Sequence, residues 1–130
     1  MKSETKNWLD MVDYDLITAK QMLETSRYVY VIFMCHMAIE KALKAIVCEE
    51  TDKVPPKTHD LIYLTGLGKV KLTPDTLDFI GMINNAGIVT RYPEDLSKLV
   101  SSYPVDVAKE YLQKTQEVIK CIKQNPVLKG

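Results

Sequence analysis

Apolar side chains recur every three or four residues through the first part of the chain, with charged residues between them. The apolar positions are Trp8, Val12, Leu16, Ala19 and Leu23. Such spacing is typical of an amphipathic helix, which we predict over residues 3–24. A second helix is predicted over residues 27–50; it is nearly continuous in apolar residues up to position 40, so most of its first half must be covered. Because few residues separate the two helices, we expect an antiparallel hairpin.

Prolines and glycines divide the central part of the chain. Pro55 and Pro56 cannot continue a helix, because proline lacks a backbone N–H and disfavours the helical conformation of the residue before it. After this loop the pattern predicts a short helix that begins with Thr58 as its N-cap and ends at Gly66 and Gly68.

A longer helix is predicted to begin at Thr73, an N-cap followed by a proline at the first helical position, and to end before Pro93. Gly81 and Gly87 lie inside this helix. Each costs up to about 1 kcal/mol relative to alanine, so we expect a close helix approach or a local irregularity there.

The last part of the chain completes the bundle. Residues 94–103 are weakly patterned and are interpreted as a connection, and a final amphipathic helix is predicted between Pro104 and Pro126. No strand-like alternation or internal repeat interrupts the helical pattern. The sequence therefore predicts one all-α domain over residues 1–130, an up-and-down four-helix bundle with a short extra helix in the central connection.

Composition narrows the classes of function. The 17 basic residues equal the 17 acidic ones, which argues against a domain-wide cationic field for gripping nucleic acid, although a local basic patch stays open. Cys35, Cys48 and Cys121 form no CxxC motif and are interpreted as buried free thiols in a reducing compartment. The N-terminus lacks the apolar stretch of a signal peptide, and the longest apolar run, residues 28–39, is shorter than the about 20 residues that cross a bilayer. We therefore expect a cytoplasmic protein without membrane association.

The first group of polar residues with chemical potential lies in the second helix. His36, Glu40 and Lys44 are spaced four apart, so a helix stacks them on one face, with Lys41 beside them. This strip suits contact with a phosphate or a metal ion. It is a poor metal site, because His36 and Glu40 supply two ligands and the sequence places no third, so we predict no metal and no cofactor. The alternative is a structural Glu–Lys pair with a hydrogen-bonded histidine.

Two further groups lie later in the chain. His59 follows Thr58 at a predicted helix start, where free backbone N–H groups can receive an anion beside the imidazole; the alternative is an ordinary helix cap with His59 packed against the loop. Arg91 ends the longer helix before Tyr92 and Pro93. Its planar guanidinium suits a phosphate or carboxylate, and it can equally cap the last carbonyls of its own helix.

Taken in order and with their helical settings, these motifs resemble the HEPN domain family, in its compact prokaryotic members, over nearly the whole chain. The motifs are Trp8 with Asp15, Leu16 and Ala19; the run His36-Met37-Ala38-Ile39-Glu40-Lys41-Ala42-Leu43-Lys44-Ala45; Thr58-His59-Asp60-Leu61; and Thr90-Arg91-Tyr92-Pro93. The resemblance implies a four- or five-helix bundle that dimerises and often works beside a small nucleotidyltransferase encoded by a neighbouring gene.

The resemblance also allows a test for catalysis. Many members of the family are RNA-cleaving toxins that use an arginine followed, after four to six intervening residues, by a histidine. Arg27 and Arg91 are the only arginines here, and neither is followed by histidine at that spacing. Loss of a general acid–base group lowers rates by roughly two to four powers of ten. We therefore expect a non-catalytic binding module; the alternative is an atypical ribonuclease in which His36 or His59 replaces the absent residue.

Expectations about partners follow from the same resemblance. We expect a homodimer and a nucleotidyltransferase partner, in a toxin–antitoxin-like pair. Other members have been proposed to bind nucleotides or small polyanions, and Lys41, Lys44, His59 and Arg91 are the residues here that suit such a ligand. RNA is a less favoured ligand, because the required histidine spacing is absent.

Overall fold

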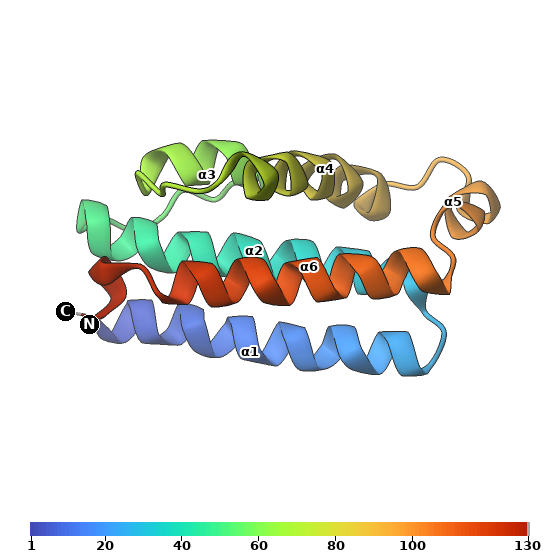
Figure 1. The fold of residues 1–130 in the computed structure, drawn as a ribbon, viewed down its shortest axis with the longest axis horizontal. Helices are drawn as coiled ribbons and strands as arrows, with labels where there is room; N and C mark the ends of the chain where they lie inside the picture. Colours follow the sequence, from blue (N-terminus) through green and yellow to red (C-terminus); the bar gives the residue numbers. More distant parts are fainter. Residues whose placement is uncertain (130) are drawn as a thin grey trace.

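The chain is described by a computed structural model over residues 1–129, which fold into helices without any strand (Figure 1). In chain order the elements are α1 (Ser3–Glu24), α2 (Tyr28–Thr51), α3 (Leu61–Leu67), α4 (Pro74–Arg91), α5 (Leu96–Ser102), α6 (Val105–Lys123) and the 3-10 turn η1 (Pro126–Lys129). The predicted all-α class is confirmed. Helices α1, α2, α4 and α6 are the four predicted long helices, and α3 is the predicted short one.

Helix α2 is the centre of the bundle. It contacts each of the other helices in the described chain, and 15 of its 24 residues are buried. Helices α1 and α6 lie along it, and α3 and α4 follow one another along another side (Figure 1). Because few of its faces are left to water, its sequence is nearly continuous in apolar residues.

The hairpin of α1 and α2 is antiparallel, as predicted, and it is closed by a short turn (Figure 1). Ser26 adopts the left-handed conformation, with φ of 64°, after the last turn of α1. The backbone N–H of Arg27 then donates to the carbonyl of Met22 at 2.8 Å. The chain therefore reverses within three residues, which sets α1 alongside α2 over their whole length.

The start of α3 differs from the prediction. Its N-cap is Asp60 rather than Thr58, since the Asp60 carboxylate accepts hydrogen bonds from the backbone N–H groups of Ile62 and Tyr63, at 3.0 and 3.2 Å. Thr58 Oγ1 instead accepts from the N–H of Asp60 at 3.1 Å. Both residue types are common caps, so composition alone does not separate two candidates that lie two positions apart.

The prediction that residues 94–103 form a connection was wrong in part, because they contain α5. The Asp95 carboxylate caps this helix by accepting from the N–H of Lys98 at 3.1 Å. No residue of α5 is buried. A helix that buries no face needs no apolar stripe, and for that reason its sequence shows no helical periodicity.

Two further expectations from the sequence can be compared with the structure. Cys35 and Cys48 are buried free thiols as predicted, whereas Cys121 is exposed, so the interpretation of all three as buried was wrong. Within residues 1–129, no helix combines the length and the apolar character that a membrane span requires.

Candidate functional site

Polar side chains from three parts of the chain surround the buried carboxylate of Glu40, which lies in the middle of α2. Only 3% of Glu40 is exposed. Its Oε2 lies 3.0 Å from Lys44 Nζ, and its Oε1 lies 2.8 Å from His59 Nδ1. Arg91 Nη2 and His36 Nδ1 approach the same Oε1, at 3.6 and 3.8 Å. We call His36, Glu40, Lys44, His59 and Arg91 the Glu40 cluster.

Local structure explains how these residues meet. His36, Glu40 and Lys44 share one face of α2 because they are four residues apart. His59 immediately precedes the Asp60 cap of α3, which fixes the backbone where the imidazole leaves the chain. Arg91 occupies the last turn of α4, whose approach to α2 brings the guanidinium back over the carboxylate. The cluster therefore joins α2, the loop before α3 and the end of α4.

The energetics of the cluster favour keeping it intact. Removing a carboxylate from water costs several kcal/mol unless cations and donors replace the lost hydration. Lys44 and Arg91 provide two permanent cations, of which only 8% and 10% of the side chains are exposed. Lys44 Nζ also lies 5.5 Å from the centre of the Trp8 ring, and the Arg91 guanidinium lies 5.0 Å from that of Phe33. Aromatic faces stabilise such desolvated cations.

Arg91 has the helix-capping role that was one of its two interpretations, and it also faces a carboxylate of its own chain. Its Nη1 donates to the carbonyl of Gly87 at 3.3 Å, so it caps its own helix. Its Nη2 faces the Glu40 carboxylate and also contacts His36 Nδ1 at 3.3 Å and Met37 Sδ at 2.9 Å. Only 10% of the Arg91 side chain is exposed, which leaves little of the guanidinium to receive a phosphate.

His36 is almost fully enclosed, with 1% of its surface exposed. Its pKa is lowered to about 4, mainly because burial disfavours the charged imidazole and also because the Arg91 guanidinium is close; the Glu40 carboxylate acts in the opposite direction. The ring is therefore neutral at pH 7. Since Nδ1 faces the Arg91 donor, it acts as the acceptor, and Nε2 carries the hydrogen. This Nε2 has no hydrogen-bond partner within residues 1–129.

Gly87 gives His36 its space. A Cβ atom added at Gly87 would lie 2.2 Å from His36 Cδ2, which is far inside the contact distance of two carbon atoms. The close helix approach predicted for the glycines of α4 is thus confirmed at Gly87. It does not occur at Gly81, where an added Cβ would meet nothing within 4 Å.

His59 is the exposed member of the cluster. Its side chain is 58% exposed, while Nδ1 is held by Glu40 at 2.8 Å. A carboxylate on Nδ1 fixes the orientation of an imidazole and leaves Nε2 for another partner. Of the five residues, His59 is therefore the one that a molecule in solution can reach most directly.

Lys41 is the candidate residue that the structure places elsewhere. Its Nζ lies 2.6 Å from Asp15 Oδ2, in an ion pair between α2 and α1. Asp15 is itself 4% exposed and falls between the buried residues Val12 and Ala19 of α1. That buried-face spacing was the signal in the sequence that marks Asp15 as a partner. Lys41 thus joins the two hairpin helices and is not part of the Glu40 cluster.

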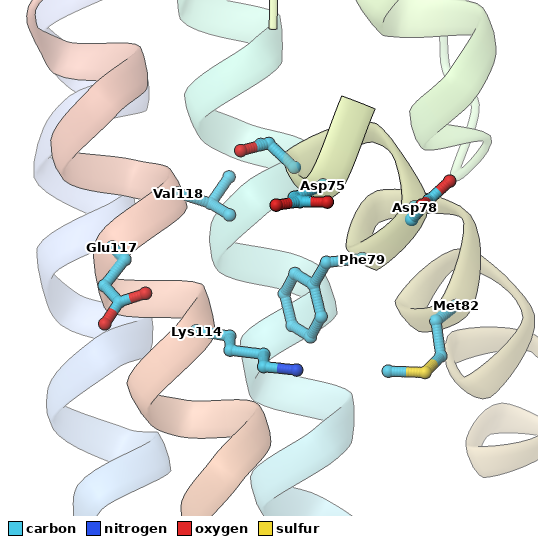
Figure 2. A pocket seen from close by; sticks show the side chains of 8 residues that line it. Asp75, Asp78, Phe79, Met82, Lys114, Glu117 and Val118 are labelled. Atoms are coloured by element: carbon cyan, nitrogen blue, oxygen red, sulfur yellow. The ribbon is translucent and has the colours of Figure 1, made fainter. Parts of the chain in front are cut away.

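No group of three or more histidine, cysteine, aspartate or glutamate side chains in residues 1–129 is arranged to hold a metal ion. A cavity of about 460 Å³ lies between α4 and α6 (Figure 2). It is lined by Asp75, Thr76, Asp78, Phe79, Met82, Lys114, Glu117 and Val118. None of these belongs to the Glu40 cluster, and the sequence singled out none of them as a functional residue.

The class of protein that this architecture defines is a helical bundle in which the central helix carries an internal ionic cluster. Two solved structures share the fold. TT1696 from Thermus thermophilus superposes with a TM-score of 0.80 at 20% identity, covering 95% of this chain and 98% of the other. ST0689, described as an archaeal HEPN homologue, superposes with a TM-score of 0.73 at 20% identity, covering 95% and 97%. At such low identity the likeness establishes the fold.

The family itself follows from the sequence comparison. The model of the HEPN domain family matches residues 5–125, which is most of the chain. The chain therefore belongs to the HEPN domain family, and the resemblance drawn from its motifs is confirmed. No curated protein is significantly similar to it.

Proposed function

We propose that this protein is a non-catalytic HEPN binding module that acts as a homodimer. The supporting observation is that the charged side chains of the Glu40 cluster are mostly buried and paired with one another. Lys44, Arg91 and His36 are almost completely buried and contact one another or Glu40, so they are unsuited to touching a substrate. An arginine and a histidine that contact each other and a buried carboxylate have little surface left to stabilise the charge of a transition state.

We propose that the second copy docks at the C-terminal end of α4. Ile88, Val89 and Tyr92 are 57%, 48% and 73% exposed, and with Leu99 of α5 they line a groove of about 640 Å³. We call these four residues the α4–α5 groove. Contiguous exposed apolar surface of this kind marks interaction sites.

Charge at the rim of the α4–α5 groove supports a copy of the same chain as the occupant. Glu94, Asp95 and Lys98 line the groove beside its apolar residues. A two-fold interface places the same patch on both sides, so a rim that carries both signs can pair with itself. Analytical ultracentrifugation of the purified protein tests this: we expect a dimer at high micromolar concentration, and a monomer there overturns the dimer.

The second part of the proposal concerns a protein partner. The motif resemblance implies a small nucleotidyltransferase encoded next to this gene, in a toxin–antitoxin-like pair. Co-expression of the two products with a tag on one of them is the direct experiment. We expect stoichiometric co-purification that survives a second column. Separate elution of two folded proteins, or a gene neighbourhood without any nucleotidyltransferase, contradicts this partnership.

A small polyanion such as a nucleotide is a second candidate ligand of the Glu40 cluster. The supporting observation is the exposed imidazole of His59, which would be the group that touches the ligand; the buried Lys44 and Arg91 would contribute only their charge, as two cations that face a single carboxylate. Isothermal titration calorimetry with a nucleotide panel is the test, with His59→Ala as the site variant and Lys20→Gln, at an exposed lysine of α1, as the control. We expect heat that His59→Ala removes and the control retains. No heat with any nucleotide discards this ligand class.

The ribonuclease alternative is weaker on geometric grounds. Arg91 and His36 are neighbours in space although no Arg–His motif exists in the sequence, but His36 is 1% exposed and cannot reach a phosphodiester. His59 alone is accessible. We expect the purified protein to cleave single-stranded RNA no faster than its Arg91→Ala variant does. Cleavage that is lost in Arg91→Ala and in His59→Ala, with both variants folded, would establish the enzyme.

A further inference from the structure

A cavity lined by no residue of the Glu40 cluster, although Lys44 of that cluster lies 5.5 Å from the centre of the Trp8 ring in its wall, is found where the start of α1 meets the end of α2 and the loop after it. Its volume is about 530 Å³. Its apolar lining comes from Trp8, Cys48, Val54 and Pro55. Its polar lining comes from Lys2, Glu4, Asn7, Asp52 and Lys53. Small-molecule sites typically occupy roughly 300–1,000 Å³ and combine an apolar or aromatic wall with a few polar groups.

We propose that this cavity binds a small, uncharged heteroaromatic ring that stacks on the Trp8 indole. Trp8 is half-buried in α1 and lines the cavity. Aromatic rings prefer offset-stacked or edge-to-face contact with one another, which an indole at a cavity wall offers. The proposal is independent of dimerisation and of any nucleotidyltransferase partner.

Val54 is the second observation that points to a ligand. It is 89% exposed, more than any other large apolar side chain exposed on the described surface, and it stands at the edge of the cavity. The next residue, Pro55, is buried and fixes the backbone beneath it. A flat ring between Trp8 and Val54 would cover both apolar side chains, and removing them from water favours binding.

The cavity wall is already ordered by contacts of Lys2. Its backbone N–H donates to Glu49 Oε1 at 2.7 Å, and its Nζ donates to the carbonyl of Cys48 at 3.0 Å. The same ammonium forms an ion pair with Asp52. These contacts tie the start of α1 to the end of α2, so the cavity does not have to form when a ligand arrives. Preorganisation of this kind lowers the entropic cost of binding.

The charges at the cavity favour a ligand without net charge. Lys2 and Asp52 neutralise each other, the Lys44 ammonium near the Trp8 ring is paired with Glu40, and Glu4 and Lys53 remain as one charge of each sign. The Asn7 side chain adds an amide at the cavity wall, whose one side-chain hydrogen bond within residues 1–129 is a long one from Nδ2 to Met11 Sδ, at 3.8 Å. Its oxygen can accept from an amino or amide N–H attached to the ring, which favours a substituted heterocycle over a plain hydrocarbon ring.

Trp8 is the only tryptophan of the chain, so its fluorescence reports directly on the cavity. We would titrate the intact protein with adenosine and with nicotinamide, two uncharged heterocycles from different sources, and with cyclohexanol as a non-aromatic probe. We expect a saturable change in Trp8 emission with at least one heterocycle and none with cyclohexanol. AMP should bind no more than threefold tighter than adenosine, because the phosphate meets no net positive charge.

Variants make the test specific. Val54→Asp changes an exposed residue, so the fold is retained, and it should weaken ring binding at least tenfold. Val89→Asp, in the α4–α5 groove, is the matched control and should leave ring binding unchanged. The proposal is overturned if neither heterocycle gives saturation at millimolar concentration, if Val54→Asp binds normally, or if AMP binds more than tenfold tighter than adenosine.

Discussion

At the scale of single residues, the protein is characterised by a carboxylate that is buried together with its counter-charges. Glu40 is 3% exposed, and its two oxygens meet Lys44, His59 and Arg91. Buried ion pairs contribute little net free energy when they are complete, because desolvation offsets attraction, but breaking one is costly. The cluster should therefore show its importance when one member is changed.

Glu40→Gln is expected to lower the free energy of unfolding by about 3 kcal/mol, because it leaves Lys44 and Arg91 buried without their anion. Urea unfolding monitored by circular dichroism measures this. The matched control is Glu110→Gln, which breaks an exposed pair with Lys114 at 3.0 Å, and should cost less than about 1 kcal/mol. Equal effects of the two substitutions would show that the burial of Glu40 is energetically unimportant.

His36 predicts a dependence of stability on pH. Its pKa is about 4 in the folded chain and 6.5 for an ordinary histidine, so the unfolded state binds the proton more readily. Stability is therefore complete above about pH 6.5 and falls as the pH decreases toward 4. A shift of this size corresponds to a loss of about 2 kcal/mol between pH 7 and pH 5.

Urea titrations at several pH values would measure this loss, and His59→Ala is the control because it keeps His36. The His36 C–H signals in a proton NMR titration report the same pKa without any variant. A midpoint for His36 near 6.5 would contradict the burial that the structure assigns to it.

At the scale of elements, α4 contains two glycines at which substitution by alanine should change the stability of the protein in opposite directions. An alanine Cβ at Gly87 would lie 2.2 Å from His36 Cδ2, whereas at Gly81 it would meet nothing within 4 Å. In both positions alanine favours the helix itself by about 1 kcal/mol. Only at Gly87 does the steric clash with His36 of α2 cost more than that gain in helix stability.

We expect Gly81→Ala to raise the free energy of unfolding by up to about 1 kcal/mol, and Gly87→Ala to lower it by about 1–3 kcal/mol through overpacking against His36. Thermal and urea unfolding of the two variants, measured side by side, give both signs in one experiment. If both alanines stabilised the protein, the contact between α4 and α2 would have to be looser than described.

At the scale of the whole molecule, two surfaces lie outside the buried core and serve separate proposals. The α4–α5 groove belongs to the proposed dimer, and the cavity at Trp8 belongs to the proposed ring ligand. The residues that line one do not line the other. Each proposal can therefore fail without affecting the other.

Val89→Asp is the substitution that tests the dimer. A carboxylate at this 48% exposed position would be buried against its own copy in the assembly, so we expect the dimer dissociation constant to rise at least tenfold. Sedimentation velocity over a concentration series measures the change. Val54→Asp is the control and should sediment as the unchanged protein does. Dimers of equal strength in Val89→Asp would place the interface elsewhere.

Most helices were predicted correctly because their apolar spacing and their capping residues can be recognised from residues close together in the sequence. The bounds of α1 were predicted to the residue, and Thr73 and Pro74 marked the start of α4. The exceptions were elements without such signals. Helix α5 buries no side chain, and α3 offered two caps, Thr58 and Asp60, between which the sequence does not choose.

The sequence by itself determined the class of the fold, the faces of the helices and the family, since each depends on spacing along one chain. It also placed His36, Glu40 and Lys44 in one row. The Glu40–Lys44 pair also follows from that row, but only the tertiary structure decided which charges from other elements join it. His59 and Arg91 reach Glu40, whereas Lys41 pairs with Asp15 of α1. The physical reason is that partners more than one helical turn away come from other elements, whose distance and orientation no local pattern records.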